Sequence, residues 1–170
     1  SVGVKQGGKP LDRDNAGKVS ALNFGSETKN IKDADLVHVA ALPAVRSINL
    51  TQSLITDAGM PALAKASTLR LIRLAQTDLG DEGVSALAAL PELAELDIGH
   101  TAITGAALTA VSGFPKIQTL VINSTGVSAE GLAALAKLRT LRVLSAASMK
   151  PFTAEMLPAI AGISGLTNLQ

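Results

Sequence analysis

The fold follows from two adjacent copies of one pattern, LRLIRLAQTDLGDEGVSALAALPE (69–92) and LAELDIGHTAITGAALTAVSGFPK (93–116). Apolar residues occupy the same seven places in both copies, and successive copies open 24 residues apart. The opening residues are Val45, Leu69, Leu93, Ile117 and Leu141. A fixed period of this length indicates a repeat architecture in which each copy is one structural unit.

The pattern continues in both directions with small insertions. An earlier copy opens at Val19, and the copy from Leu141 carries one extra residue near Lys150. After that insertion the apolar pattern is predicted to resume with Phe152, Leu157, Ile160 and Ile163. The chain therefore divides into an amino-terminal cap hairpin, 1–18, and a repeat array, 19–170. The predicted copies are 19–44, 45–68, 69–92, 93–116, 117–140, 141–165 and a partial copy at 166–170.

Each copy combines two periodicities. Its first part alternates apolar and other residues, which predicts a strand with one buried face. Its second part spaces apolar residues three apart, as in Met60, Leu63 and Ala66, which predicts one stripe of a short helix. Hydroxyl residues precede the helices and are predicted to cap them: Thr56, Thr104, Ser128 and Thr153. Neither half can bury its apolar face alone, so neighbouring copies must stack.

Segments such as TGVSAEGLAALAKL (125–138) resemble the leucine-rich repeats of bacterial planctomycete-type proteins and, more distantly, F-box-associated and effector repeats. The resemblance implies an α/β fold: a right-handed leucine-rich repeat solenoid, or horseshoe, with a parallel sheet on the concave face and short helices on the convex face. In the repeats that this chain resembles, an Asn or Cys at one position of each copy forms a row, or ladder, of side chains along the array. Here Thr77, Thr101 and Thr125 take that position, and Ser53 takes it once. We expect these hydroxyls to bond loop backbone between coils, more weakly than Asn would.

Composition excludes several classes of protein. With no Cys and two His, the chain has neither disulfides nor a thiolate nucleophile, and we expect no metal site and no cofactor. A net charge of +1 and the absence of Trp and Tyr argue against a nucleic-acid partner. No apolar run is long enough for membrane insertion. The chain opens at Ser1 without a leader, either because one was cleaved or because the sequence starts later, and an exported location is favoured over a cytoplasmic one.

Two segments resemble ligand-binding motifs but lack residues that those motifs require. The segment DRDNAGKVSALN (12–23) opens like a calcium loop, but Ala16 and Asn23 stand where ligands belong, so a polar hairpin turn with tight dihedrals at Asn15 and Gly17 is the simpler interpretation. The overlapping AGKVS lacks both the first Gly and the Ser or Thr of a phosphate loop. A local run of bases, Lys137, Arg139, Arg142 and Lys150, is either a solvated edge or a weak site for an anionic partner.

The outward strand positions are free of the packing constraint, so a partner site is expected there. The candidate residues on the concave face are Leu71, Arg73, Glu95, Asp97, His100 and Val121. Two interpretations of the charges stay open: Arg73 and Asp97 neutralise each other across neighbouring strands, or they contact a partner. His100 lies beside two carboxylates, but nothing resembling a nucleophile accompanies it, so no catalytic residue is assigned.

The sequence therefore predicts a bacterial, non-enzymatic scaffold that binds a protein partner on its concave sheet. The alternative is a recognition arm of a larger signalling or F-box-like effector protein. We also expect the last strand, Thr167–Gln170, to be an uncovered edge. Either the natural chain continues beyond Gln170, or a second copy covers this edge in a homodimer.

Overall fold

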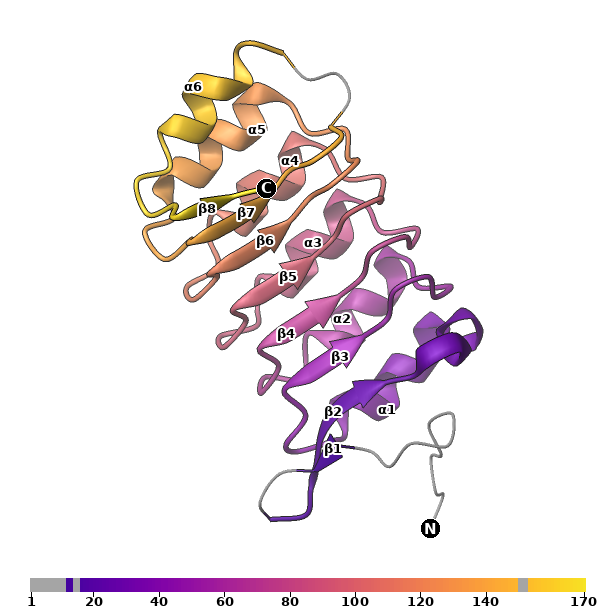
Figure 1. Ribbon diagram of the computed structural model, residues 1–170. Coiled ribbons are helices and arrows are strands. Elements are labelled where there is room, and N and C mark those ends of the chain that lie inside the picture. The colour runs from indigo at the N-terminus through magenta and orange to yellow at the C-terminus, as the bar shows by residue number, and fades with distance from the viewer. Residues whose placement is uncertain (1–11, 14–15, 150–152) are drawn as a thin grey trace.

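The computed structural model describes residues 12–13, 16–149 and 153–170. Its strands form one sheet in chain order, from β1 to β8. The strands are β1 (Asp12–Arg13), β2 (Val19–Asn23), β3 (Ser47–Asn49), β4 (Leu71–Arg73), β5 (Glu95–Asp97), β6 (Thr119–Val121), β7 (Val143–Ser145) and β8 (Asn168–Leu169). Strands β2 to β8 are parallel, whereas β1 pairs antiparallel with β2. The chain is thus an α/β solenoid that adds one strand per coil (Figure 1).

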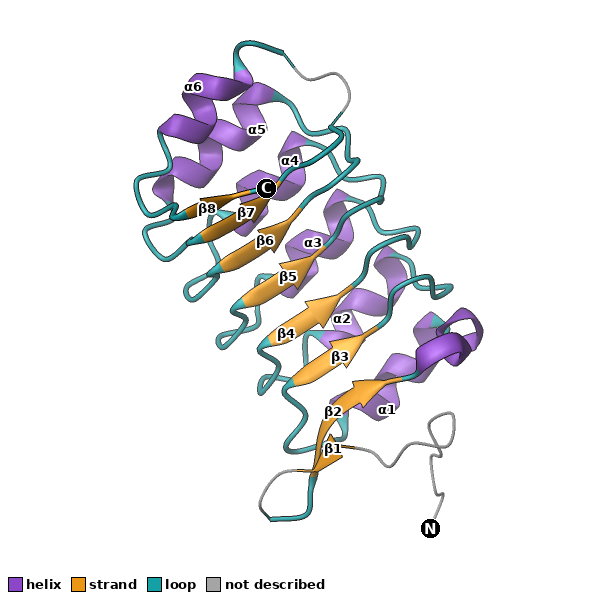
Figure 2. Ribbon diagram, viewed as in Figure 1, coloured by secondary structure: helices purple, strands orange, loops and turns teal. Residues whose placement is uncertain are grey.

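Short helices connect the strands and cover one face of the sheet (Figure 2). The α-helices are α1 (Leu36–Ala40), α2 (Met60–Leu63), α3 (Asp81–Leu87), α4 (Gly105–Val111), α5 (Ala129–Ala134) and α6 (Met156–Ala161). Short 3-10 helices also occur: η1 (Gly25–Asn30), η2 (Asp33–Asp35), η3 (Asp57–Gly59) and η4 (Leu135–Lys137). Among the described residues, no helix has the length and apolar character needed to cross a membrane.

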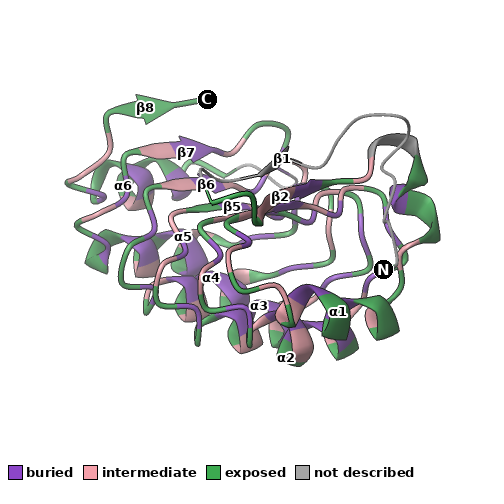
Figure 3. Ribbon diagram, turned by 90° about the horizontal axis from the view of Figure 1, so that it is seen from below, coloured by how far each residue is buried: buried purple, intermediate pink, exposed green. Residues whose placement is uncertain are grey.

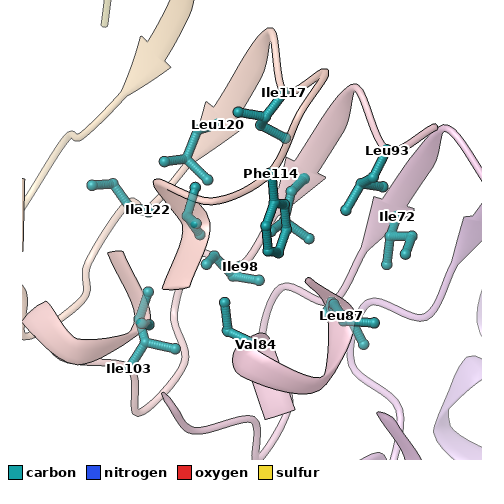
Figure 4. Close-up of a cluster of buried hydrophobic side chains, with 14 of the residues drawn as sticks. Ile72, Val84, Leu87, Leu93, Ile98, Ile103, Phe114, Ile117, Leu120 and Ile122 are labelled. Carbon is teal, nitrogen blue, oxygen red and sulfur yellow. The ribbon is translucent and has the colours of Figure 1, made fainter. Parts of the chain in front are cut away.

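The core lies between the sheet and the helices (Figure 3). All five residues that open the repeat from Val45 to Leu141 are buried, as are the middle residues of β3 to β7. Phe114 is the one aromatic residue that is buried in the described part of the chain, and it packs among aliphatic side chains of neighbouring coils (Figure 4). The predicted alternation and the stacking of copies are therefore confirmed in the structure.

The predicted helix caps are confirmed at three of four positions. The hydroxyls of Thr56, Thr104 and Ser128 accept hydrogen bonds from the backbone N–H groups of Ala58, Ala106 and Gly131, at 3.2, 3.3 and 3.3 Å. The prediction for Thr153 is wrong, because α6 begins three residues later, at Met156, after Glu155.

The phase predicted for the last helix is also wrong. Leu157 is 57% exposed, whereas its neighbour Met156 is buried together with Ile160 and Ile163. These buried residues are spaced four and then three apart, as on one stripe of an α-helix. Met156 follows its equivalent Leu132 by 24 residues, whereas Ile160 follows Leu135 by 25, so the extra residue is accommodated after Met156 and not before the helix. Phe152 lies outside the described residues, as do most of the predicted cap hairpin and Asn15; Gly17 has the positive φ of 74° expected for its turn.

Candidate functional site

The sheet register brings the predicted site residues together on the face away from the helices. Leu71 on β4 is paired with Glu95 on β5, Arg73 with Asp97, and Asp97 with Val121 on β6. The residues between them, such as Ile72 and Leu96, are buried, so the side chains that flank them along each strand lie on the opposite face. The predicted placement of these five residues on one surface is therefore observed.

These side chains line a depression of about 110 Å³ in the middle of the sheet. Its lining residues are Leu71, Ile72, Arg73, Glu95, Leu96, Asp97, Thr119 and Val121. Leu71 and Val121 are half-buried, whereas Arg73 and Glu95 are exposed. A small, partly apolar surface is thus bordered by one basic side chain and two acidic ones. Pockets for drug-sized ligands measure about 300–1,000 Å³, so this depression has room for one side chain of a partner.

The predicted neutralisation of Arg73 by Asp97 is not observed. The ion pairs of the described residues are Arg70–Glu92 and Lys116–Glu92. The Asp97 carboxylate instead accepts a hydrogen bond from the backbone N–H of Gly99 at 3.1 Å, which directs it along its own strand. Arg73 and Glu95 form no hydrogen bond or ion pair with any described side chain. Two charges of the sheet face are therefore available to a partner.

His100 lies at the rim and does not line the depression. It is exposed, its φ is 55°, and its backbone N–H donates to the carbonyl of Asn123 on the next coil at 2.7 Å. The equivalent residue of every coil from β3 to β7 has the same left-handed backbone, with φ between 55 and 62° at Gln52, Gln76, His100, Ser124 and Ser148. Residues other than glycine adopt this conformation at a cost, so the rim retains polar side chains where the backbone alone would favour glycine.

The predicted hydroxyl ladder between coils is also wrong. Each hydroxyl donates to a carbonyl of its own coil three residues earlier: Ser53 to Leu50, Thr77 to Leu74, Thr101 to Ile98 and Thr125 to Ile122, at 2.6–2.7 Å. A hydroxyl has a single O–H donor, and here the turn of the same coil uses it. The ladder therefore stabilises turns, and the bonds between coils come from other groups.

Aspartates that sequence analysis missed link the coils at the helix side. The Asp33 carboxylate accepts bonds from the N–H and hydroxyl of Thr56, at 2.9 and 2.7 Å. Asp57 accepts from the N–H of Gly80 at 2.7 Å, and Asp81 accepts from the N–H and hydroxyl of Thr104 at 2.7 and 2.6 Å. The 24-residue spacing of Asp57 and Asp81 was the signal available in the sequence.

At position 105, 24 residues after Asp81, the chain has Gly in place of Asp, so the row of aspartate links ends there. A second depression of about 350 Å³ lies at this position. Its lining is small and polar: Thr104, Gly105, Ala106, Thr109, Gly126, Ser128, Glu130 and Gly131. Pockets that bind small ligands are lined mainly by apolar and aromatic side chains, which this surface lacks. Among the described residues, no group of three His, Asp or Glu side chains could hold a metal ion.

One carboxyl group is electrostatically perturbed. The hydrogen bond from Lys116 lowers the pKa of Glu92 below its ordinary value; desolvation opposes this effect, and the charges of Lys116 and Arg70 add to it. Glu92 precedes β5, outside the depression on the sheet, so this shift belongs to an edge of the sheet and not to an acid–base site.

Comparison with known proteins agrees with this geometry. Residues 65–88 match the family model described as Leucine Rich repeat. An internalin (inlF) from Listeria monocytogenes is 20% identical with a TM-score of 0.62, and internalin C2 (inlC2) from the same bacterium is 25% identical with a TM-score of 0.61. Each covers 79% of this chain, which spans 37% of the first protein and 54% of the second. No curated protein matches the sequence. The period, the parallel sheet and the matched repeat show that this chain has the fold of a leucine-rich repeat solenoid.

Proposed function

We propose that the protein is an interaction scaffold that binds a protein partner on the concave face of its sheet. The proposed contact residues are Leu71, Arg73, Glu95, Asp97 and Val121, with His100 at the rim. The observation that carries the proposal is the central depression, where half-buried apolar side chains lie next to Arg73 and Glu95, two charges without partners among the described residues.

The left-handed rim supports the same surface. Strained backbone conformations persist where the side chain is useful, and five successive coils retain Gln, His or Ser at this place. Gln52 already donates to the side-chain carbonyl of Gln76 at 2.9 Å, so these amides are held in position at the border of the sheet. A partner seated on the strands would meet this polar rim around an apolar centre, which is the usual anatomy of a protein interface.

A recognition arm within a larger signalling or effector protein is the second candidate. It is favoured by the length of the similar internalins, of which this chain spans 37% and 54%. Both candidates use the same sheet face, and leucine-rich repeats typically serve as non-enzymatic scaffolds. They differ in whether this face recruits a substrate for a neighbouring domain.

Selection from a random peptide library displayed on phage tests the site, because it requires no identified partner. Peptides selected on the folded protein should bind the Arg73→Glu variant about tenfold more weakly or worse, because reversal replaces an attraction by a repulsion at a desolvated centre. The matched control is Lys32→Glu, which reverses one exposed charge outside the sheet face. Equal affinity of the peptides for both variants would remove the site from the sheet.

A further inference from the structure

The residues that immediately precede the strands form a second row across the coils. Backbone hydrogen bonds link Arg46, Arg70, Ala94, Gln118 and Arg142 in sequence: each N–H donates to the carbonyl of the preceding member at 2.7–2.9 Å. This row lies at the edge where the strands begin, which Figure 1 shows as parallel loops at the tails of the arrows. It is separate from the central depression, which lies on the strands themselves.

Positive charge gathers along this edge. Between the helix of one coil and the strand of the next, the described chain carries seven bases and a single acid, Glu92. We call the seven bases the basic edge: Arg46, Lys65, Arg70, Lys116, Lys137, Arg139 and Arg142. Because the net charge of the whole protein is only +1, this density is a local concentration and not a general property of the surface.

Glu92 neutralises only part of the basic edge. It pairs with both Arg70 and Lys116. Arg142 is used internally, since its guanidinium donates to the carbonyls of Arg139, Leu141 and Gly165. The side chains of Arg46, Lys137 and Arg139 are exposed and have no hydrogen-bond or ion-pair partner among the described residues.

The opposite edge, where strands lead into helices, shows the reverse charge and a different use of it. Its described acids are Glu27, Asp33, Asp35, Asp57, Asp78, Asp81, Glu82, Glu130 and Glu155. Asp33, Asp57 and Asp81 are committed to backbone amides of the next coil. Three of these nine acids therefore stabilise the solenoid through bonds to the backbone of the next coil, whereas among the seven bases only Arg142 makes such a bond within the described chain.

Helix dipoles do not explain the arginines of the basic edge, although Lys137 lies in the last turn of the three-residue helix η4. A cation stabilises a helix C-terminus only when it lies within the last turn, and the effect is small even for long helices. Arg46 follows the end of α1 at Ala40 by six residues, and Arg70 follows the end of α2 at Leu63 by seven. Both arginines belong to the row in front of the strands, where no helix carbonyl requires a charge.

We propose that the basic edge binds an acidic polypeptide segment of a partner protein. With about 4.8 Å between strands, the row from Arg46 to Arg142 is roughly 19 Å long, which an extended segment of about six residues spans. Carboxylate side chains of that segment would pair with the free cations at Arg46, Lys137 and Arg139. The site does not depend on the concave-face proposal, because it uses other residues on another surface.

An octaglutamate peptide with an uncharged fluorophore is the probe, and fluorescence anisotropy at low salt is the readout. Binding to the 170-residue protein should weaken about tenfold in the Arg46→Glu/Arg139→Glu variant, since each reversal removes an attraction and adds a repulsion. The matched control, Lys29→Glu/Lys32→Glu, changes the net charge equally at the opposite edge and should alter binding by less than about twofold. Circular dichroism verifies that both variants are folded.

Three results would overturn the proposal. The first is that octaglutamate does not bind the wild-type protein at low salt. The second is that the two variants weaken binding equally, which would mean that net charge and not the edge attracts the peptide. The third is tighter binding of a double-stranded DNA oligonucleotide, or of phosphatidylserine vesicles, than of the peptide at equal charge concentration, which would assign the edge to another class of partner.

Discussion

Asp81 uses both carboxylate oxygens on the coil that follows its own. It accepts the N–H and the hydroxyl of Thr104 and, at 3.1 Å, the N–H of Ala107. These donors lie at the start of α4, where backbone amides have no partner within the helix. One side chain therefore both caps a helix and joins two coils. The link between coils recurs at Asp33 and, with one bond, at Asp57.

Replacing Asp81 by Ala should lower the free energy of unfolding by about 1–3 kcal/mol, because bonds to a charged acceptor are lost and the amides of α4 lose their cap. Urea titration followed by circular dichroism measures the change. Glu82→Ala is the control, since Glu82 is an exposed neighbour with no partner among the described residues. Equal midpoints for the two variants would show that the aspartate links contribute nothing.

Leu96 tests the core at the same scale. It is 1% exposed in the central strand β5, so truncation to Ala leaves a cavity that neighbouring coils cannot fill. We expect a loss of about 2–5 kcal/mol in unfolding free energy, as for other buried leucines. Because each coil stacks on two others, the loss should reduce the cooperativity of the transition as well as its midpoint. An unresolved midpoint shift would contradict the inward position of Leu96.

At the scale of the elements, the coils meet in two different ways. From η2 to α4 an aspartate bridges each pair of coils, whereas α4 and α5 touch through glycines. A Cβ atom added at Gly131 would collide with the Cα of Gly105, so this contact has no room for any side chain. Direct contact between the backbones of α4 and α5 at Gly105 and Gly131 thus replaces the aspartate link that joins the earlier coils.

Gly131→Ala should therefore destabilise the protein, although Ala favours a helix by about 1 kcal/mol over Gly. Overpacking costs about 1–3 kcal/mol, so the expected net loss is about 1–2 kcal/mol. Gly126→Ala is the control, because its added Cβ would meet only the Ile103 carbonyl, at 3.7 Å. Thermal or urea unfolding distinguishes them, and a stabilised Gly131→Ala protein would mean that the coils are farther apart than described.

At the scale of the whole molecule, the two ends of the sheet differ. The short antiparallel strand β1 pairs with one edge, whereas β8 forms the other edge and both of its residues are exposed. Leu157 and Leu169 of this last coil are 57% and 51% exposed, two of the four large hydrophobic side chains that are exposed among the described residues. An uncovered strand with apolar neighbours can pair with another chain.

We therefore expect the 170-residue chain to associate with a second copy through β8. Light scattering over a concentration series should show a rising mass, and Leu169→Lys should suppress the rise, since a charge on an edge strand opposes pairing. Leu54→Lys, at an exposed leucine far from β8, serves as the control. A mass that stays monomeric at all concentrations would refute this association.

The repeat and its inward columns are predictable from sequence because the same local contacts recur in every coil. The sheet face is predictable for the same reason: alternation places Arg73 and Asp97 outside once Ile72 and Leu96 are inside. The partner of a hydrogen bond is not predictable in this way, because a threonine hydroxyl can bond within its own turn or to a neighbouring coil. Here Thr77 bonds within its own turn. Nor does spacing reveal that Asp97 bonds to Gly99, or that the extra residue of the last coil is accommodated after Met156, which leaves Met156 and not Leu157 in the core.

If the partner site lies on the sheet, a peptide from the phage selection should leave its footprint there. Amide chemical shifts of the labelled protein, recorded during titration with a peptide from the phage selection, should change most in β4, β5 and β6, at residues 71–73, 95–97 and 119–121. Residues of the helices, such as 105–111, should be unaffected. Changes confined to the helices or to the β8 edge, with no change in β4 to β6, would mean that the peptide does not bind on the sheet.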